Sequence, residues 1–209
     1  NEKEFFCLNF YVDENVLIPR QETEFLVEEV IKLIPVYNFT AIIADIGTGC
    51  GNIAISIVKN INSSIKMYAT DISVESLNIA KKNAVYHNVE DKIYFVLTDK
   101  LQYFLDNSIV LDVIVSNPPY VTEEEYKYLQ PEIYYEPRQA IVSPTGLEFY
   151  TYFASHSKKV LTKDGCLVLE INPNLYNEIC GLFKQKGFYI YKTVYDYQNL
   201  PRVIVVRNN

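Results

Sequence analysis

The apolar positions along the chain follow two different spacings. Short apolar and β-branched runs, typical of buried strands, occupy residues 41–46, 65–70, 92–97, 109–116, 166–171, 188–195 and 202–207. Apolar side chains recur every three or four residues, as in helices, over residues 22–34, 52–60, 73–86, 146–161 and 174–185. Strands that alternate with helices predict an α/β fold in which helices cover both faces of a mostly parallel sheet.

The last two strand-like runs are an exception to this alternation. Only a short segment containing Asn199, Leu200 and Pro201 separates 188–195 from 202–207. Parallel neighbours need a crossover connection of a dozen or more residues, so these two runs should be antiparallel neighbours. We therefore expect a seven-stranded sheet with an antiparallel last strand.

The beginning of the chain reads differently again. Residues 4–12 and 15–18 contain aromatic and β-branched runs that Asp13 and Glu14 separate, which predicts a hairpin or an extended lead-in. Pro35 is expected to end the first helix, because proline lacks an amide hydrogen and clashes with the preceding turn. The lead-in and first helix, residues 1–36, would thus precede a main domain of residues 37–209.

Composition excludes several classes of protein. The 209 residues are 49% hydrophobic and 22% charged, which is usual for a globular domain and unlike a disordered chain or a coiled coil. The net charge is −7, so non-specific binding to nucleic acid is not expected. Four cysteines without a C-x-x-C pair, and only two histidines, predict no metal site.

The same composition bears on the compartment. The sequence has no apolar run long enough to cross a membrane, no signal peptide and no visible disulfide framework, so a cytoplasmic protein is expected. The sole methionine is Met67, and the chain therefore reads as a piece of a longer gene product.

A glycine-rich turn follows the first strong strand, over residues 45–51 (Asp-Ile-Gly-Thr-Gly-Cys-Gly). Glycines let the backbone approach a ligand closely, and the next helix offers free N–H groups. The spacing is neither G-x-G-x-x-G nor that of a phosphate loop. Asp45 beside the turn disfavours a pyrophosphate and suits a cationic or hydroxyl-bearing ligand.

Two further acids are expected at the same edge of the sheet. Asp71 ends the second strand, where an α/β nucleoside site places a carboxylate against ribose hydroxyls, and Asp99 follows the third strand and could face an adenine. S-adenosylmethionine fits, since it combines a nucleoside with an ammonium and a sulfonium and has no phosphate. The alternative is a tight turn with the acids acting only as caps.

The fourth strand ends in Asn117, Pro118, Pro119 and Tyr120. The prolines fix the backbone and remove two N–H donors, so the turn presents carbonyl oxygens. The Asn117 side chain and the Pro118 carbonyl could accept both hydrogens of an amide or amine, and Tyr120 would form a wall beside it. Holding a weakly nucleophilic amide nitrogen in line with a methyl donor can be worth about 7–11 kcal/mol of barrier.

These residues resemble the HemK/PrmC family of peptide chain release factor glutamine methyltransferases. The resemblance covers nearly the whole chain. Its motifs are the box at residues 16–24, similar to L-I-P-R-P-E-T-E, the turn at 45–51, Asp71, the N-P-P-Y turn, the segments at 136–140 and 146–150, and Asp196 with Arg202 and Val203. The box is much more specific to this family than N-P-P-Y, which many amino-group methyltransferases of nucleic acids share.

The resemblance implies a Rossmann-like class I fold and S-adenosylmethionine-dependent methylation of the glutamine in the Gly-Gly-Gln motif of class I release factors, with S-adenosylhomocysteine as product. It assigns the glutamine amide to Asn117, Pro118, Pro119 and Tyr120. The cofactor would lie against Thr23, Asp45, Gly47, Thr48, Gly49, Cys50, Gly51, Asp71, Ile72, Asp99, Lys100 and Asn117. Neither a membrane nor direct nucleic-acid contact is expected.

Some positions depart from the family pattern. Gln21 replaces a proline, Lys100 stands where an aromatic or apolar residue usually covers the adenine, and Asn172 stands in place of a glycine. The helical N-terminal domain with which family members dock the release factor is not in the sequence, so we expect an isolated catalytic domain.

The sequence leaves several alternatives open. The acidic, tyrosine-rich segment 121–137 is either a lid over the substrate or a solvated loop. Arg20, Glu22 and Glu24 either order the cofactor or lid, or merely begin a helix. Cys50 reads as a packing residue rather than a nucleophile. Methylation of nucleic-acid bases, and cofactor binding without catalysis, remain competing functions.

Overall fold

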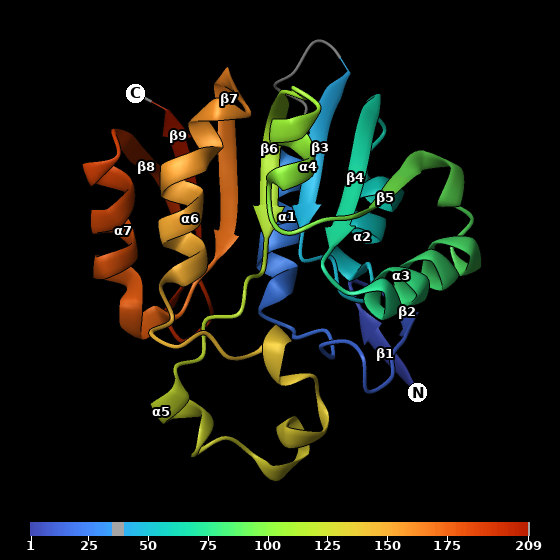
Figure 1. Ribbon diagram of the computed structural model, residues 1–209. Helices are drawn as coiled ribbons and strands as arrows, with labels where there is room; N and C mark the ends of the chain where they lie inside the picture. Colours follow the sequence, from blue (N-terminus) through green and yellow to red (C-terminus); the bar gives the residue numbers. More distant parts are fainter. Residues whose placement is uncertain (35–39, 209) are drawn as a thin grey trace.

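A computed structural model describes residues 1–34 and 40–208 of the chain. Its centre is a seven-stranded sheet with the order β5-β4-β3-β6-β7-β9-β8 (Figure 1). The strands are β3 (Ala41–Ile46), β4 (Ile65–Asp71), β5 (Ile93–Leu97), β6 (Leu111–Ser116), β7 (Leu161–Glu170), β8 (Phe188–Tyr195) and β9 (Pro201–Asn208). Neighbouring pairs are parallel from β5 to β7, whereas β9 is antiparallel to both β7 and β8. The expected mostly parallel sheet with an antiparallel last strand is confirmed.

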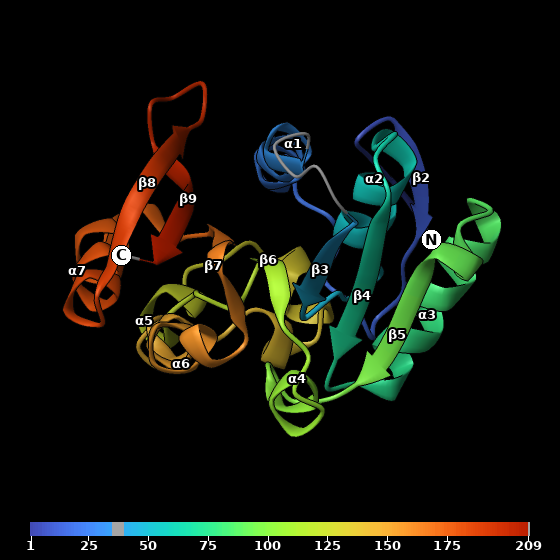
Figure 2. The same cartoon turned by 90° about the horizontal axis from the view of Figure 1, so that it is seen from above.

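Helices cover both faces of this sheet, and each face has its own hydrophobic core. The helices are α1 (Thr23–Leu33), α2 (Asn52–Asn60), α3 (Val74–Tyr86), α4 (Gln102–Asp106), α5 (Glu123–Tyr126), α6 (Glu148–His156) and α7 (Tyr176–Gln185). One core joins the sheet to α1, α2 and α3, and the other joins it to α4, α6 and α7. Figure 2 shows α1 and α2 on one side of the sheet and α4 and α6 on the other.

The near-continuous apolar runs reflect burial on both faces. In β3, for example, Ile43 belongs to the core under α1 and α2, while Ala44 belongs to the core under α4 and α6. Val113 and Ile114 of β6 divide in the same way. Consecutive side chains of a strand point to opposite faces, so a strand covered twice has no polar face.

The strand order places a crevice beside β3. The chain runs from β3 outward through β4 to β5, and then returns to β6 on the other side of β3. Connections that leave the carboxyl ends of β3 and β6 therefore diverge, and ligands bind at such switch points in α/β sheets. The arrowheads of β3, β4 and β6 in Figure 1 point toward the segment that contains α5, which lies below this edge.

The lead-in forms a hairpin, but not with the boundaries expected. Its strands are β1 (Glu2–Phe5) and β2 (Leu8–Tyr11), and the expected break at Asp13 and Glu14 is wrong. The chain turns instead at Phe6 and Cys7, whose φ angles of 52° and 58° are uncommon outside glycine and asparagine. That turn has no glycine or asparagine to signal it. Residues 15–18 form no strand.

The hairpin packs directly on the rest of the molecule. Tyr11 N–H donates to Asn83 Oδ1 at 2.8 Å, and Asn83 Nδ2 donates back to the Tyr11 carbonyl at 2.9 Å. Asn83 Nδ2 also donates to the Cys50 carbonyl at 2.8 Å. Phe5 and Phe10 are buried in the same core as α1, α2 and α3. One side chain of α3 thus holds both the hairpin and the glycine-rich turn.

Several element boundaries differ from the expected ones. The helix expected at 146–161 is shorter, because the chain tightens into a 3-10 turn at Ser157–Lys159 before Leu161 pairs with Leu111. β7 consequently begins five residues earlier than expected, at Leu161. The short helix α4 was not expected. Pro35 and the expected division between residues 36 and 37 lie outside the described residues.

Within residues 1–34 and 40–208, no helix is long and apolar enough to cross a membrane. The same residues contain no group of three or more His, Cys, Asp or Glu side chains placed to hold a metal ion.

Candidate active site

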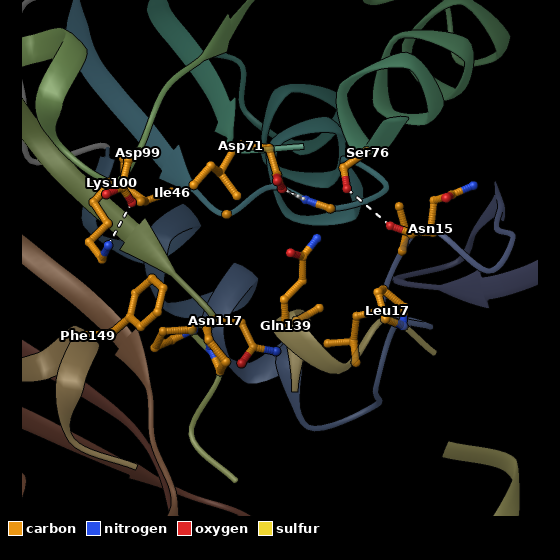
Figure 3. A pocket seen from close by; sticks show the side chains of 18 of the residues that line it. Asn15, Leu17, Ile46, Asp71, Ser76, Asp99, Lys100, Asn117, Gln139 and Phe149 are labelled. Atoms are coloured by element: carbon orange, nitrogen blue, oxygen red, sulfur yellow. Dashed lines mark hydrogen bonds and ion pairs between the residues drawn. The ribbon is translucent and has the colours of Figure 1, made fainter. Parts of the chain in front are cut away.

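Two cavities meet at the carboxyl ends of β3 and β6. The first, here called the cofactor cavity, is lined by residues that include Gly47, Gly49, Asp71, Ile72, Asp99, Lys100 and Phe149 (Figure 3). Residues 121–137, here called the lid segment, supply Leu129 and Ile133 to the lining of the second cavity. This cavity, here called the lid cavity, is also lined by Arg20 and Tyr120. Asn117, Pro118 and Pro119 line both, so the N-P-P-Y turn is their common wall.

The glycine-rich turn presents bare backbone to the cofactor cavity. Gly47 and Gly49 have φ angles of +75° and +55°, which favour glycine, and a Cβ at either would meet none of the described atoms within 4 Å. Gly51, with φ +84°, faces the other way: its Cβ would lie 3.0 Å from Ile55 and 3.1 Å from Ala80. Gly51 therefore lets α2 approach α3, whereas Gly47 and Gly49 leave room for a ligand.

Asp71 supports this turn and faces the cavity. Its Oδ2 accepts from the Gly49 N–H at 2.9 Å, and its Oδ1 accepts from the Ser73 N–H at 2.9 Å. Burial raises the pKa of Asp71, while the backbone N–H groups of Ser73 and Gly49 act to lower it. The carboxylate that the sequence assigned to a ribose thus also orients the glycine backbone.

Asp45 lies behind the turn rather than in the cavity lining. Its carboxyl group is fully buried, and Oδ2 accepts from the Thr48 hydroxyl at 2.6 Å. Oδ1 has no hydrogen-bond partner among the described residues. Burial raises the pKa of Asp45 to about 7, against the opposing effect of the Thr48 hydroxyl.

Part of the lining of the cofactor cavity is apolar and aromatic. Ile72 is 65% exposed there, which is unusual for an isoleucine next to a strand end. Phe149 enters from α6, as Figure 3 shows. Lys100 Nζ pairs with Asp99 at 2.7 Å and lies 5.0 Å from the centre of the Phe149 ring. The sequence predicted no role for Phe149 in this cavity, because its position along the chain does not place it near Asp99.

The N-P-P-Y turn contacts residues far away in the sequence. Asn117 Nδ2 donates to Thr23 Oγ1 at 3.1 Å, and Thr23 Oγ1 donates to Glu170 Oε2 at 2.7 Å. The Tyr120 hydroxyl donates to Glu170 Oε1 at 2.9 Å. Tyr120 lines the lid cavity and is not in the lining of the cofactor cavity. Sequence reasoning missed Glu170, which only reads as the end of a buried strand.

Glu170 is the second fully buried carboxyl group near the site. Burial raises its pKa to about 7, while hydrogen bonds from Thr23 and Tyr120 oppose the rise. Burial and the neighbouring Glu170 carboxylate together raise the pKa of Tyr120 well above its usual value. Tyr120 is therefore a neutral donor at physiological pH.

The residues of the box at positions 20–24 have separate tasks. Arg20 Nη2 pairs with Glu136 Oε1 at 2.6 Å, and the Ile18 N–H donates to Glu136 Oε2 at 3.0 Å. Glu24 accepts from the Phe6 N–H at 2.9 Å, and Glu22 lies 3.9 Å from Arg202. Arg20 thus holds the lid segment, and Glu24 holds the hairpin.

The side chain of Cys50 in the turn is buried, and burial raises the pKa of its thiol to about 12. It lines a smaller hollow that also contains Thr23, Thr48 and Asn117. A thiol that stays protonated is a poor nucleophile, so its place in the structure agrees with packing.

Comparison with known proteins agrees with this geometry. The model of the methyltransferase small domain family matches residues 21–191. The release factor glutamine methyltransferase of Clostridium acetobutylicum is 35% identical over 97% of this chain and 71% of that protein. That of Chlorobaculum tepidum is 36% identical over 95% of this chain and 69% of that protein. The chain belongs to the release factor glutamine methyltransferase family.

The fold agrees with the same assignment. The crystal structure of the hMettl16 catalytic domain in complex with the MAT2A 3′UTR hairpin 1 superposes with a TM-score of 0.74, covering 98% of this chain and 76% of that one. At 19% sequence identity this likeness concerns the fold alone. The sheet and its helices form the class I fold of S-adenosylmethionine-dependent methyltransferases.

The departures from the release factor glutamine methyltransferase pattern have structural counterparts. Asn172 Nδ2 lies 3.2 Å from both carboxylate oxygens of Glu125, the residue that completes the capping box of α5 with Thr122. Lys100 covers the aromatic end of the cofactor cavity with its ammonium group on Phe149 and Tyr152. Gln21 lies exposed in the turn that precedes α1.

The structure therefore sorts the residues that the sequence singled out. Those that line the cofactor cavity are Gly47, Gly49, Asp71, Ile72, Asp99, Lys100, Asn117, Pro118 and Pro119. Thr23, Thr48 and Cys50 line the smaller hollow beside it, and Asp45 and Gly51 lie outside all three linings.

Proposed function

We propose that this chain transfers a methyl group from S-adenosylmethionine to the side-chain amide nitrogen of the glutamine in the Gly-Gly-Gln motif of a class I peptide chain release factor. The observation that carries this proposal is the shared wall. A cavity suited to a nucleoside and a cavity suited to an amide side chain adjoin at Asn117 to Pro119, which line both. A methyl donor in one cavity and its acceptor in the other can come into contact at this junction, as transfer requires.

The residues of the cofactor cavity fit S-adenosylmethionine. The glycine turn has no Lys or Arg that would attract phosphate, and a Cβ at Gly47 or Gly49 would fill the open space. Asp71 offers carboxylate oxygens near the turn, while Ile72 and Phe149 supply apolar surface for a planar base. When bound, the cofactor supplies an electrophilic methyl group on its sulfonium.

The chain's own groups prepare the amide. The Asn117 side-chain oxygen and the Pro118 carbonyl accept the two amide hydrogens, and Tyr120 limits the position of the planar group. Two acceptors draw charge onto the nitrogen, whose lone pair is otherwise delocalised. The nitrogen–carbon bond would form as the carbon–sulfur bond of the donor breaks, leaving S-adenosylhomocysteine as a neutral thioether. The nitrogen would lose one of its two hydrogens as a proton to water, so no strong general base is needed.

The lid segment favours a protein substrate over a nucleic acid. It holds five glutamates and four tyrosines, and the whole chain has a net charge of −7. Phosphate groups would be repelled at the mouth of the lid cavity. The four cysteines are free, which fits a reducing cytoplasm, where release factors act.

Methyl-labelled S-adenosylmethionine tests the proposal against its competitors. We expect label on a release factor and none on the same factor with the motif glutamine changed to alanine. A structured RNA in a third reaction should stay unlabelled. Label on RNA alone would establish a base methyltransferase, and cofactor binding without any transfer would establish a binding module.

A further inference from the structure

We propose that Thr23 and Glu170 form a positioning relay that fixes the amide of Asn117 with its oxygen toward the substrate. This inference rests on the proposed function, because it specifies how Asn117 comes to accept a hydrogen from the substrate amide. Thr23 and Glu170 touch neither substrate nor cofactor in this account. They act through Asn117 and Tyr120.

The relay consists of three hydrogen bonds between distant segments. Asn117 Nδ2 donates to Thr23 Oγ1 at 3.1 Å, and Thr23 Oγ1 donates to Glu170 Oε2 at 2.7 Å. Tyr120 donates to the second carboxylate oxygen, Glu170 Oε1, at 2.9 Å. Thr23 and Glu170 are 2% and 1% exposed, so water does not compete for these contacts.

The chemistry of the donors sets the direction of the chain of hydrogen bonds. An ionised carboxylate only accepts, so the single hydroxyl proton of Thr23 must point to Glu170. Thr23 Oγ1 then has only lone pairs left for its other neighbour, which must be the NH₂ group of Asn117. The amide oxygen of Asn117 is thereby left for the substrate.

Protonation of Glu170 removes the constraint that fixes the donor and acceptor roles in these hydrogen bonds. A protonated Glu170 can donate to Thr23, whose hydroxyl then becomes free to donate to Asn117 and to favour the flipped amide. The groups that face Glu170 are Thr23 from α1, Tyr120 from the N-P-P-Y turn, Glu22 before α1 and Arg202 from β9. The Tyr150 hydroxyl of α6 donates to the backbone carbonyl of Glu170 at 2.8 Å, and burial together with the charges of Tyr120 and Glu170 raises the pKa of Tyr150 well above its usual value.

The relay therefore predicts a pH dependence of transfer. Burial is the largest influence on Glu170 and raises its pKa to about 7. Because the ionised form sets the productive orientation, kcat should rise with pH through this value. Glu170→Gln should remove that rise, since a glutamine has no proton to lose in this range.

Three variants test the relay on a release factor substrate. Thr23→Val keeps the shape and removes the hydroxyl, and we expect kcat to fall about 10- to 100-fold, since small misplacements of a reacting group have effects of this size. Thr23→Ser restores the hydroxyl and should stay within about threefold of the wild type. Tyr150→Phe is the control for disturbance near Glu170, because it leaves the relay intact, and it should retain the pH profile.

A second readout does not depend on turnover. The side-chain NH₂ resonances of Asn117, assigned by their absence in Asn117→Ala, should shift in Thr23→Val and not in Tyr150→Phe. A Thr23→Val enzyme with wild-type kcat and unshifted resonances would overturn the relay. Failure of the wild-type chain to label any release factor would instead overturn the proposed function, while the resonance shift would still report on the relay.

Discussion

Two carboxyl groups near the site lie in buried surroundings that disfavour their charged form. Asp45 and Glu170 are both fully buried acids, and burial raises the pKa of each to about 7. A buried carboxylate without full compensation costs stability, so such residues are retained where a site needs them. Asp45 receives one hydroxyl on Oδ2 and leaves Oδ1 without a partner among the described residues.

Replacing Asp45 should therefore stabilise the protein at high pH. The folded-state pKa of about 7 lies above the ordinary value of 3.8, so this group's contribution to stability is lost as pH rises between those values. Asp45→Asn does not ionise. Its free energy of unfolding should exceed that of the wild type by on the order of 1–3 kcal/mol at about pH 8, and the difference should vanish near pH 4.

Urea unfolding across this pH range measures the difference. Asp196→Asn is the matched control with the opposite sign, because backbone N–H groups and Arg202 lower the pKa of Asp196. That variant should lose stability at neutral pH and match the wild type in acid. A constant difference between Asp45→Asn and the wild type across the whole range would refute the assignment.

Site residues that directly follow a strand could be predicted from the sequence, whereas buried residues that support them from another element could not. Gly49, Asp71 and Asn117 were found because the carboxyl ends of parallel strands meet at one edge. No role was predicted for Glu170, because its contact with Thr23 spans 147 positions along the chain. A buried glutamate in an apolar strand was the one available signal.

At the scale of elements, the turn between β3 and α2 depends on helix packing as much as on ligand binding. Gly51 is the N-cap of α2 and adopts φ +84°, and its missing Cβ lets Ile55 and Ala80 pack closely. A side chain at this position would meet both strain and overlap.

Gly51→Ala should thus destabilise the chain by about 1–3 kcal/mol, through positive φ and contact with α3. Gly181→Ala offers the contrast, because Gly181 lies inside α7 and a Cβ there would meet no described atom within 4 Å. That change should stabilise by about 0.5–1 kcal/mol. Thermal unfolding of both variants tests this contrast. Equal shifts of the two melting temperatures in the same direction would count against the packing explanation.

A partly buried ion pair joins the lid segment to the beginning of the chain. Arg20 and Glu136 join the box to the end of the lid, and the side chain of Glu136 is 5% exposed. The pair of Arg138 with Glu123 also lies in this region, but both of its partners are more than 40% exposed. Buried charges that lose their partner are costly, whereas exposed pairs contribute little.

Arg20→Ala should therefore loosen the lid segment, and Arg138→Ala should not. We expect limited proteolysis within residues 121–137 to become about tenfold faster in Arg20→Ala, since local opening follows the free energy lost. The KM for release factor should rise with it. Equal protease sensitivity of the two variants would mean that the Arg20–Glu136 pair does not hold the lid.

Elements with a strong hydrophobic period were predictable, whereas short ones were not. The strands from β3 to β6 follow mostly apolar runs, and α3 follows a clear helical period. The turn at Phe6 and Cys7 has no glycine or asparagine, and α4 has only five residues, so neither has a local signal. Register and packing against the sheet decide both.

At the scale of the whole molecule, the sheet brings residues from every part of the chain to one edge. The lead-in supplies Thr23 and Arg20, β3 and β4 supply the glycine turn and Asp71, and β7 supplies Glu170. Figure 1 shows the lead-in and the lid segment together below the carboxyl ends of the strands. The resemblance indicated that these segments belong to one site, and the strand order explains why.

In the proposed function, cofactor binding and positioning of the substrate amide belong to different cavities, and Asn117 lines both. The glycine turn and Asp71 can hold a nucleoside without Asn117, since they are supported by the backbone and by Ser73. In the proposed function, the substrate amide donates one hydrogen to the Asn117 side-chain oxygen, and the Pro118 carbonyl accepts only the other. Loss of Asn117 should therefore affect transfer far more than cofactor affinity.

Asn117→Ala measures this separation most directly. Calorimetric titration gives the Kd for S-adenosylmethionine, and mass spectrometry of the Gly-Gly-Gln peptide gives the rate of methylation. We predict a Kd within about fivefold of the wild type and a rate at least about 100-fold lower, the size of effect seen when one preorganised group is removed. A variant that methylates the peptide at the wild-type rate would contradict the account.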